Sequence, residues 1–118
     1  MSLERVEEAD GRLALLLEAV ERGTPQTMIA QGRSMLPAIP PGSTVRLSAL
    51  VGEPALGDIV AAWLDEGGFC IHRVVGVRKG PAWLLKGDNN PRPDGWIARE
   101  GLLARVELVP AAGPWRER

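Results

Sequence analysis

Apolar residues in the first 23 positions recur at the three- and four-residue spacing of an amphipathic helix: Leu3, Val6, Leu13, Leu16, Leu17 and Val20. Ser2 is a suitable N-cap for this helix, and Gly23 follows the last apolar position, where glycine commonly ends a helix. The segment also carries several glutamates, which oppose binding to an anionic membrane. We therefore expect the apolar face to pack on the domain or on a partner protein, with membrane-surface binding as the lesser alternative.

After Gly23 the pattern changes to short alternating or apolar runs that are separated by glycine and proline, as is typical of β-strands. The predicted strands are residues 27–31, 44–48, 58–64, 69–77, 82–86 and 102–109. Short glycine-containing connections predict an antiparallel meander from residue 58 to residue 86. The expected fold is mainly β, with a helix in residues 1–24, one β domain in residues 25–110 and a tail in residues 111–118.

Composition and charge limit the classes of function. A chain of 118 residues, 45% of them hydrophobic and 25% charged, is typical of one soluble globular domain. Its formal net charge of −1 gives no attraction for nucleic acid. The single cysteine, Cys70, excludes an intramolecular disulfide framework and a cysteine-based metal cluster.

Neither export nor membrane anchoring is indicated by the pattern. The first ten residues carry four acidic side chains and lack the basic and apolar regions of a secretory signal. The longest apolar run, residues 13–17, is far shorter than the roughly 20 residues that a membrane-spanning helix needs. The expected location is the cytoplasm, with no transmembrane segment.

Candidate chemistry begins at Ser34, in the segment GRSMLPAIPPG of residues 32–42. Gly32 permits a sharp backbone path, and the prolines that follow stiffen the turn, so the segment can present a hydroxyl group. A serine becomes a nucleophile only when a base lies within hydrogen-bond reach and another group orients that base. His72 is the only histidine in the chain. Strand alternation places it on one face with Cys70 and Val74.

Two acids are available to orient the histidine. Asp88 and Asp94 both lie in the polar turn KGDNNPRPD of residues 86–94. A carboxylate at either position could accept the imidazole N–H and hold the tautomer that takes the serine proton. The spacing leaves both acids open. Lys79, an alternative base, stands beside a Gly-Pro turn and is the weaker hypothesis.

Four blocks occur in an order that resembles the catalytic domain of signal peptidases: GRSMLPAIPPG, then GDIV at 57–60, IHRVVGV at 71–77 and KGDNN at 86–90. The resemblance covers residues 27–109. Bacterial signal peptidases and the related LexA-type self-cleaving repressors use a lysine base, whereas the archaeal and endoplasmic-reticulum enzymes have a histidine, which is His72 here. The resemblance implies a small coiled, partly open β-barrel and a Ser34–His72–Asp94 triad, with Asp88 as a second essential acid or a turn-fixing residue.

The implied reaction is acyl transfer, in which His72 takes the Ser34 proton and water later releases the acyl-enzyme. This reaction needs no metal and no cofactor, so we expect neither. The resemblance places the oxyanion hole at the nucleophile turn, with the Ser34 backbone N–H as one donor. Some family members carry a serine two positions before the nucleophile as a further donor. Gly32 stands there in this chain, so the second donor stays unassigned.

The family cleaves extended peptides after small side chains, and the substrate pairs with edge strands. Met35 and Ile39 are either pocket walls or ordinary core residues. Arg73 and Lys86 are interpreted as structural ion-pair or turn partners. The four tryptophans could form a membrane-facing surface as in the family, but core or rim positions are favoured.

The expected function is therefore a serine endopeptidase that processes a leader or signal-type peptide without a membrane anchor, with the N-terminal helix available to a protein partner. One alternative is a non-catalytic β module that binds a peptide or partner in the same cleft. Another is a repressor-derived domain that cleaves itself. The chain shows no pair of DNA-binding helices before the β domain, which counts against that last hypothesis.

Overall fold

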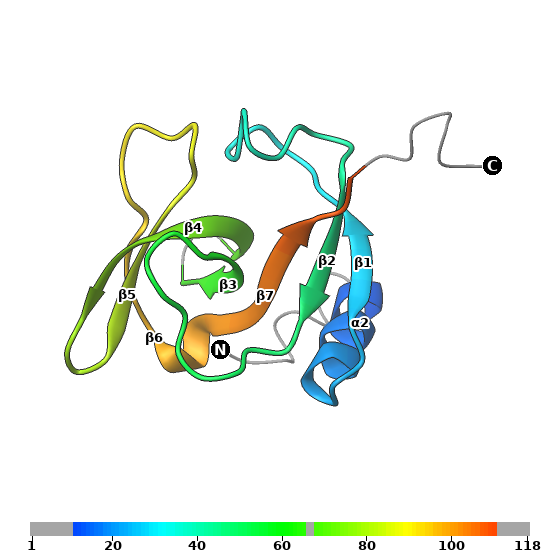
Figure 1. Cartoon of the computed structure of the whole chain (residues 1–118), viewed down its shortest axis with the longest axis horizontal. Helices are drawn as coiled ribbons and strands as arrows, with labels where there is room; N and C mark the ends of the chain where they lie inside the picture. The colour runs from blue at the N-terminus through cyan, green and yellow to red at the C-terminus, as the bar shows by residue number, and fades with distance from the viewer. Residues whose placement is uncertain (1–10, 66–67, 111–118) are drawn as a thin grey trace.

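One antiparallel sheet forms the body of the protein. The structure is a computed structural model that describes residues 11–65 and 68–110. Its elements are α2 (Gly11–Glu21), β1 (Gln26–Ile29), β2 (Thr44–Ser48), β3 (Ile59–Leu64), β4 (Gly68–Arg78), β5 (Ala82–Lys86), β6 (Gly95–Ala98), the 3₁₀ turn η1 (Arg99–Gly101) and β7 (Leu102–Leu108). The strand order is β1-β2-β7-β3-β4-β5-β6, so β1 and β6 are the edges of an open sheet (Figure 1). The mainly β prediction with one helix before the sheet is confirmed.

The six predicted strands agree with observed strands to within two residues at each end. The meander of β3, β4 and β5 is also as predicted. Strand β6 was missed. It has only four residues, two of them large and apolar, and it directly follows the polar turn. This segment is too short to show the alternation of apolar and polar residues that predicts a strand. It pairs with β5, where Trp96 lies opposite Leu84, and extends the sheet beyond the predicted meander.

Helix α2 packs its apolar side against β1, β2 and β7 (Figure 1). Its buried residues Ala14, Leu17 and Val20 follow the spacing that predicted the helix. The helix ends at Glu21, and Gly23, with a φ of 98°, lies just beyond its last turn as expected. There the N–H of Gly23 donates to the Val20 carbonyl and that of Thr24 to the Ala19 carbonyl, which is a Schellman C-cap. Positions 1–10 of the predicted helix, with Ser2, and the predicted tail lie outside the described residues.

Two hydrophobic clusters fill the two sides of the coiled sheet. Strand β3 contributes to both, because its four central residues are all buried and successive side chains point to opposite faces. Ala61 and Trp63 join the cluster under α2, and Val60 and Ala62 join the cluster under β5. Met35 and Ile39 belong to the first cluster. They anchor the loop that carries Ser34 on the core.

The connections β1–β2 and β5–β6 meet at one end of the sheet, at the top of Figure 1. The first contains the serine block and the second contains the two predicted acids. They are joined by a hydrogen bond of 2.7 Å from the Asn89 N–H to the Ser34 carbonyl. At this end of the molecule the serine block therefore meets the block that contains Asp88.

The tryptophans are divided between core and surface. Trp63 and Trp83 are buried, and the Trp83 indole N–H donates to the Pro54 carbonyl at 2.9 Å. Trp96 is 40% exposed and lies under the Arg78 guanidinium. Trp115 falls outside the described residues. Among the residues described, no helix is long and apolar enough to cross a membrane.

Candidate active site

The backbone around Ser34 forms a turn that is fixed by Gly32 and by the buried side chain of Met35. Gly32 adopts a φ of 80°, a conformation that side-chain-bearing residues rarely take, and so reverses the chain after β1. The Leu36 N–H then donates to the Arg33 carbonyl, which closes a β-turn around Ser34. The Met35 side chain is buried in the core and anchors the turn there, while the Ser34 side chain next to it is half-buried.

His72 lies between Ser34 and Asp94. Its Nε2 is 3.1 Å from Ser34 Oγ, and its Nδ1 is 2.6 Å from Asp94 Oδ2. An ionised carboxylate can only accept hydrogen bonds, so Nδ1 donates to Asp94. In the neutral ring Nε2 then carries the lone pair and accepts the Ser34 hydroxyl proton. The three side chains come from the β1–β2 loop, from β4 and from the end of the β5–β6 loop.

His72 is the buried member of this chain of hydrogen bonds, whereas Ser34 is half-buried and lines the groove. His72 is only 6% exposed, and it is the one buried polar or charged side chain in the described part of the protein. A polar group in such a place needs hydrogen-bond partners, and Ser34 and Asp94 supply one for each ring nitrogen. The ring orientation is therefore set by both neighbours.

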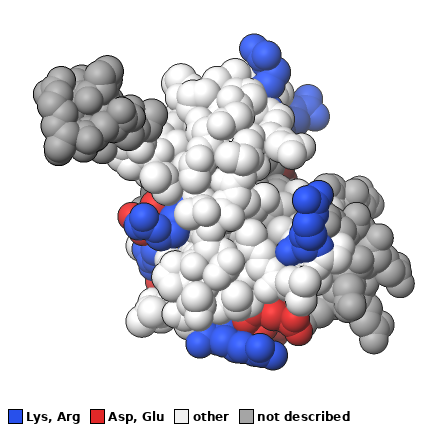
Figure 2. Space-filling model, turned by 90° about the vertical axis from the view of Figure 1, so that its right-hand side faces the viewer, with Lys and Arg blue, Asp and Glu red and all other residues white. Residues whose placement is uncertain are grey.

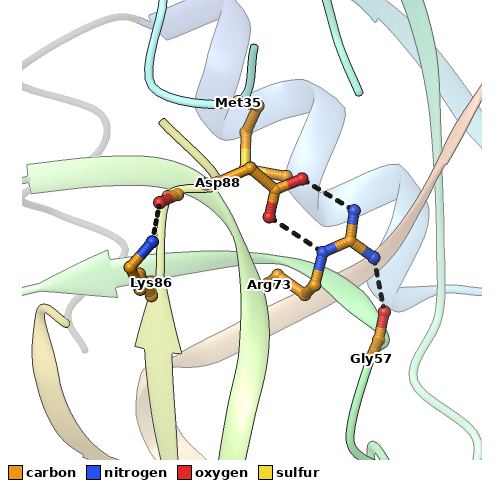
Figure 3. A network of polar contacts seen from close by, with 6 residues as sticks. Met35, Gly57, Arg73, Lys86 and Asp88 are labelled. Atoms are coloured by element: carbon orange, nitrogen blue, oxygen red, sulfur yellow. Dashed lines mark hydrogen bonds and ion pairs between the residues drawn. The ribbon is translucent and has the colours of Figure 1, made fainter. Parts of the chain in front are cut away.

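Asp94 and Asp88 have different partners, which the spacing alone had left open. Asp94 stands where the loop rejoins the sheet: its N–H donates to the Leu85 carbonyl at 2.7 Å, and its side chain reaches His72. Asp88 instead receives two hydrogen bonds from Arg73, from Nε at 2.9 Å and from Nη2 at 2.8 Å (Figure 3). Of the two candidate acids, Asp94 is the one that contacts the histidine.

Arg73 links Asp88 to the loop before β3. Its Nη1 donates to the Gly57 carbonyl at 2.9 Å, so one guanidinium joins two segments, as Figure 3 shows. Hydrogen bonding from Arg73 lowers the pKa of Asp88 below its ordinary value, and the guanidinium charge acts in the same direction. Arg73 is thus a structural ion-pair partner, and Lys86 is a turn partner that donates to the Gly87 carbonyl.

The turn of residues 87–89 contacts the backbone of the Ser34 turn, a feature that the sequence analysis did not identify. The Asn89 side-chain amide donates to the Arg33 carbonyl at 3.1 Å. The Asp88 N–H donates to the Met35 sulfur at 3.4 Å, and Figure 3 shows the Met35 side chain next to Asp88. Gly87 is so close that an added Cβ would lie 2.8 Å from the Ser34 carbonyl oxygen. These are backbone contacts, which leave no pattern in a single sequence beyond the glycine itself.

A groove of about 620 Å³ runs past Ser34 and His72. Residues from β1 and the turn after it form one wall, and residues from the facing ends of β3 and β4 form the other. The lining includes Met28, Ile29, Leu64, Phe69, Cys70 and Ile71 together with Met35 and Ile39. Met35 and Ile39 therefore belong to the hydrophobic core and also line the groove. The apolar contribution of β3 and β4 was not predicted, because it depends on how the sheet coils.

Two other groups were possible participants in the chemistry, the Cys70 thiol and the Lys79 amine. Burial, reinforced by the negative charge of Asp94, raises the pKa of the Cys70 thiol to about 12, so the thiol is neutral near pH 7. Lys79, the alternative base, is exposed at the β4–β5 turn and is not among the residues that line the groove. Neither residue contacts the Ser34 hydroxyl.

No model of a known protein family matches this chain, and no curated protein matches it either. The resemblance to signal peptidases therefore stands on the four sequence blocks. The geometry described above is independent of that resemblance.

Proposed function

We propose that the protein is a serine endopeptidase of the signal peptidase type that cleaves leader or signal-type peptides. The observation that carries this proposal is the continuous chain of contacts from Ser34 Oγ through the His72 ring to Asp94. A nucleophile, a base and an orienting acid in this order are the arrangement that serine hydrolases of unrelated folds share. A buried structural histidine also needs a partner at each ring nitrogen, so the proposal rests on the identity and order of these partners, a hydroxyl at Nε2 and a carboxylate at Nδ1.

In the proposed reaction, His72 Nε2 removes the Ser34 hydroxyl proton while Oγ attacks the carbonyl carbon of a peptide bond. Asp94 accepts the Nδ1–H throughout and stabilises the imidazolium that forms. His72 then protonates the leaving amine as the C–N bond breaks. A water molecule, activated by the same ring nitrogen, attacks the acyl-enzyme and releases the second product.

The substrate of this proposal is an extended peptide that lies in the groove. Within the described residues β1 pairs only with β2, and the first half of β4 pairs only with β3, because β5 joins β4 from Arg73 onward. Two strands with unpaired backbone groups therefore face the groove, and such groups can bind a peptide main chain. The side of the molecule with β1 and α2 shows a broad uncharged area, which suits an uncharged substrate (Figure 2).

The proposal includes the fold, a small coiled and partly open barrel as in signal peptidases. It is supported by the burial of both faces of β3 and by the convergence of the serine loop and the acid loop at one end of the sheet. It is also supported by the place of His72 on β4, directly before Arg73, as the block resemblance implies.

A fluorophosphonate probe, which phosphonylates activated serines, tests the proposal. The wild type is expected to gain one adduct on Ser34, detected by intact mass and peptide mapping. Ser34→Ala should lose the adduct, and His72→Ala should be labelled at least about 1,000-fold more slowly, since triad members act as a unit. Ser48→Ala is the matched control, because Ser48 lies on β2 and not among the groove residues.

The same experiment separates the proposed enzyme from a binding module. Equal labelling of the wild type and Ser34→Ala, or no labelling of either, would reject the triad and leave a non-catalytic cleft that binds peptide. Lys79→Ala should be labelled as fast as the wild type. A loss in that variant would instead identify a lysine base.

A further inference from the structure

The Ser34 turn presents two neighbouring backbone N–H groups. In the β-turn closed by the Leu36 N–H and the Arg33 carbonyl, the amides of Ser34 and Met35 have no partner within the turn, like the first N–H groups of a helix. Among residues 11–65 and 68–110, no hydrogen bond of the structure uses either N–H. Both residues line the groove. Two donors on one turn are what a developing oxyanion requires.

Asn89 binds the carbonyl groups of the same two peptide units. Its side-chain Nδ2 donates to the Arg33 carbonyl at 3.1 Å, and its backbone N–H donates to the Ser34 carbonyl at 2.7 Å. In a trans peptide the C=O and the following N–H point in opposite directions. Holding the Arg33 and Ser34 carbonyls on the Asn89 side therefore turns the Ser34 and Met35 N–H groups away from it.

We propose that Asn89 is a positioning residue for an oxyanion site formed by the backbone N–H groups of Ser34 and Met35. This inference rests on the proposed peptidase function. As the bond from Ser34 Oγ to the carbonyl carbon forms, the carbonyl π electrons move to oxygen, and the two N–H groups bind that anion. Met35 thereby supplies the second donor that Gly32, without a hydroxyl, does not supply. A donor from the residue after the nucleophile also serves α/β-hydrolases.

The proposal makes the Asn89 amide group itself the critical feature. A carboxylate of the same shape would place a negatively charged acceptor against the Arg33 carbonyl, which is also an acceptor. The peptide unit would then rotate away and carry the Ser34 N–H with it. Asn89 is exposed, so its replacement removes little buried surface and should leave folding intact.

Asn89→Asp and Asn89→Ala test this role with p-nitrophenyl acetate as substrate and phenylboronic acid as a tetrahedral analogue. Both variants should lose about 100-fold in kcat, the usual effect of losing one oxyanion donor, while KM changes less than about twofold. The inhibition constant of phenylboronic acid should rise by a similar factor, because its tetrahedral oxygen occupies the same site. Gln26→Glu is the matched control: it makes the same amide-to-carboxylate change on β1, outside the groove lining.

The result that overturns the inference is a wild type that hydrolyses the ester and is labelled on Ser34 while both Asn89 variants retain kcat and boronate affinity. A loss that appears in KM or in the melting temperature, with kcat unchanged, also rejects the positioning role. Failure of the proposed function has a different signature, because the wild type itself would then show neither Ser34 labelling nor Ser34-dependent hydrolysis.

Discussion

The two ends of the β5–β6 loop carry the same kind of side chain and use it differently. At the first end, Asp88 binds the permanently charged guanidinium of Arg73 and helps to fix the loop against the Ser34 turn. At the second end, Asp94 accepts a hydrogen bond from Nδ1 of the His72 imidazole, the group that takes the Ser34 proton in the proposed reaction. The difference lies in the partner and not in the acid: one aspartate braces the loop, and the other has the position of the proposed catalytic acid.

The cause of this division lies on β4. His72 and Arg73 are consecutive residues of that strand, so their side chains leave it in opposite directions. The loop passes both sides: Asp88 meets Arg73 on one and Asp94 meets His72 on the other. Asp88 and Asp94 are six positions apart, which is enough for one loop to reach the side chains on both faces of β4.

The largest expected effect is that of Asp94→Asn on the proposed activity. An amide at this position can stabilise the wrong imidazole tautomer and cannot balance the imidazolium charge, so kcat should fall by about 10,000-fold. Ester hydrolysis and fluorophosphonate labelling measure it. Asp88→Asn, the matched change at the other end of the loop, should cost about tenfold at most. Equal losses in the two variants would remove the distinction between brace and catalytic acid.

The next effect is steric and comes from the first end of the loop. Gly87→Ala would place a new Cβ 2.8 Å from the Ser34 carbonyl oxygen and 3.0 Å from the Ser34 Cβ. The Ser34 turn should then shift, and a displacement near 1 Å is expected to lower activity by about 100-fold. Gly11→Ala is the control, since its Cβ would meet no atom within 4 Å. Unchanged ester hydrolysis and Ser34 labelling in Gly87→Ala would show that the loop does not set the position of Ser34.

A smaller effect should appear in the pH dependence of stability. The pKa of Asp88 is lower in the folded protein than its ordinary value of 3.8, so the ion pair stabilises the fold fully above about pH 4. This contribution is lost as the pH falls through the lowered pKa. Asp88→Asn should therefore be less stable than the wild type by about 1 kcal/mol at pH 7, a difference that shrinks toward pH 3. Urea unfolding at both pH values measures it, and a pH-independent difference would contradict the ion-pair assignment.

The smallest effect concerns the thiol next to the histidine. With a pKa of about 12, Cys70 should react very slowly with a disulfide reagent at pH 8 in the folded protein and rapidly after denaturation. Because the charge of Asp94 contributes to this pKa, Asp94→Asn should react slightly faster, whereas Asp88→Asn should react as the wild type does. Identical rates in the two variants would place the thiol beyond the influence of Asp94.

Much of the fold followed from the pattern of apolar residues. A strand with one buried face gives an alternating pattern, and a strand with two buried faces, such as β3, gives a continuous apolar run. The helix follows from the spacing of Leu13, Leu17 and Val20. Strand β6 did not follow, since four residues with two apolar side chains make too short a pattern. Its pairing with β5 depends on the loop that returns the chain to the sheet edge.

For the site, residue type and order identified Ser34 and His72, because a base needs an imidazole and the chain has only one. The order of the blocks favoured Asp94 through a resemblance, while the chemistry of the turn left both acids open. Asn89 and Gly87 gave no signal, since an amide and a glycine are ordinary residues in any turn. Their importance comes from contacts with backbone atoms more than 50 positions away in the chain.

By itself, therefore, the sequence determined the helix, six of the seven strands and the candidate side chains of the site, because these depend on local pattern and on the chemistry of single residues. Only the tertiary structure decided which acid meets the histidine, which strands wall the groove and which turn holds the serine. Those outcomes depend on the coiling of the sheet and on the direction in which each side chain leaves β4. Each of these contacts joins residues that are far apart in the chain, so no local sequence pattern indicates it.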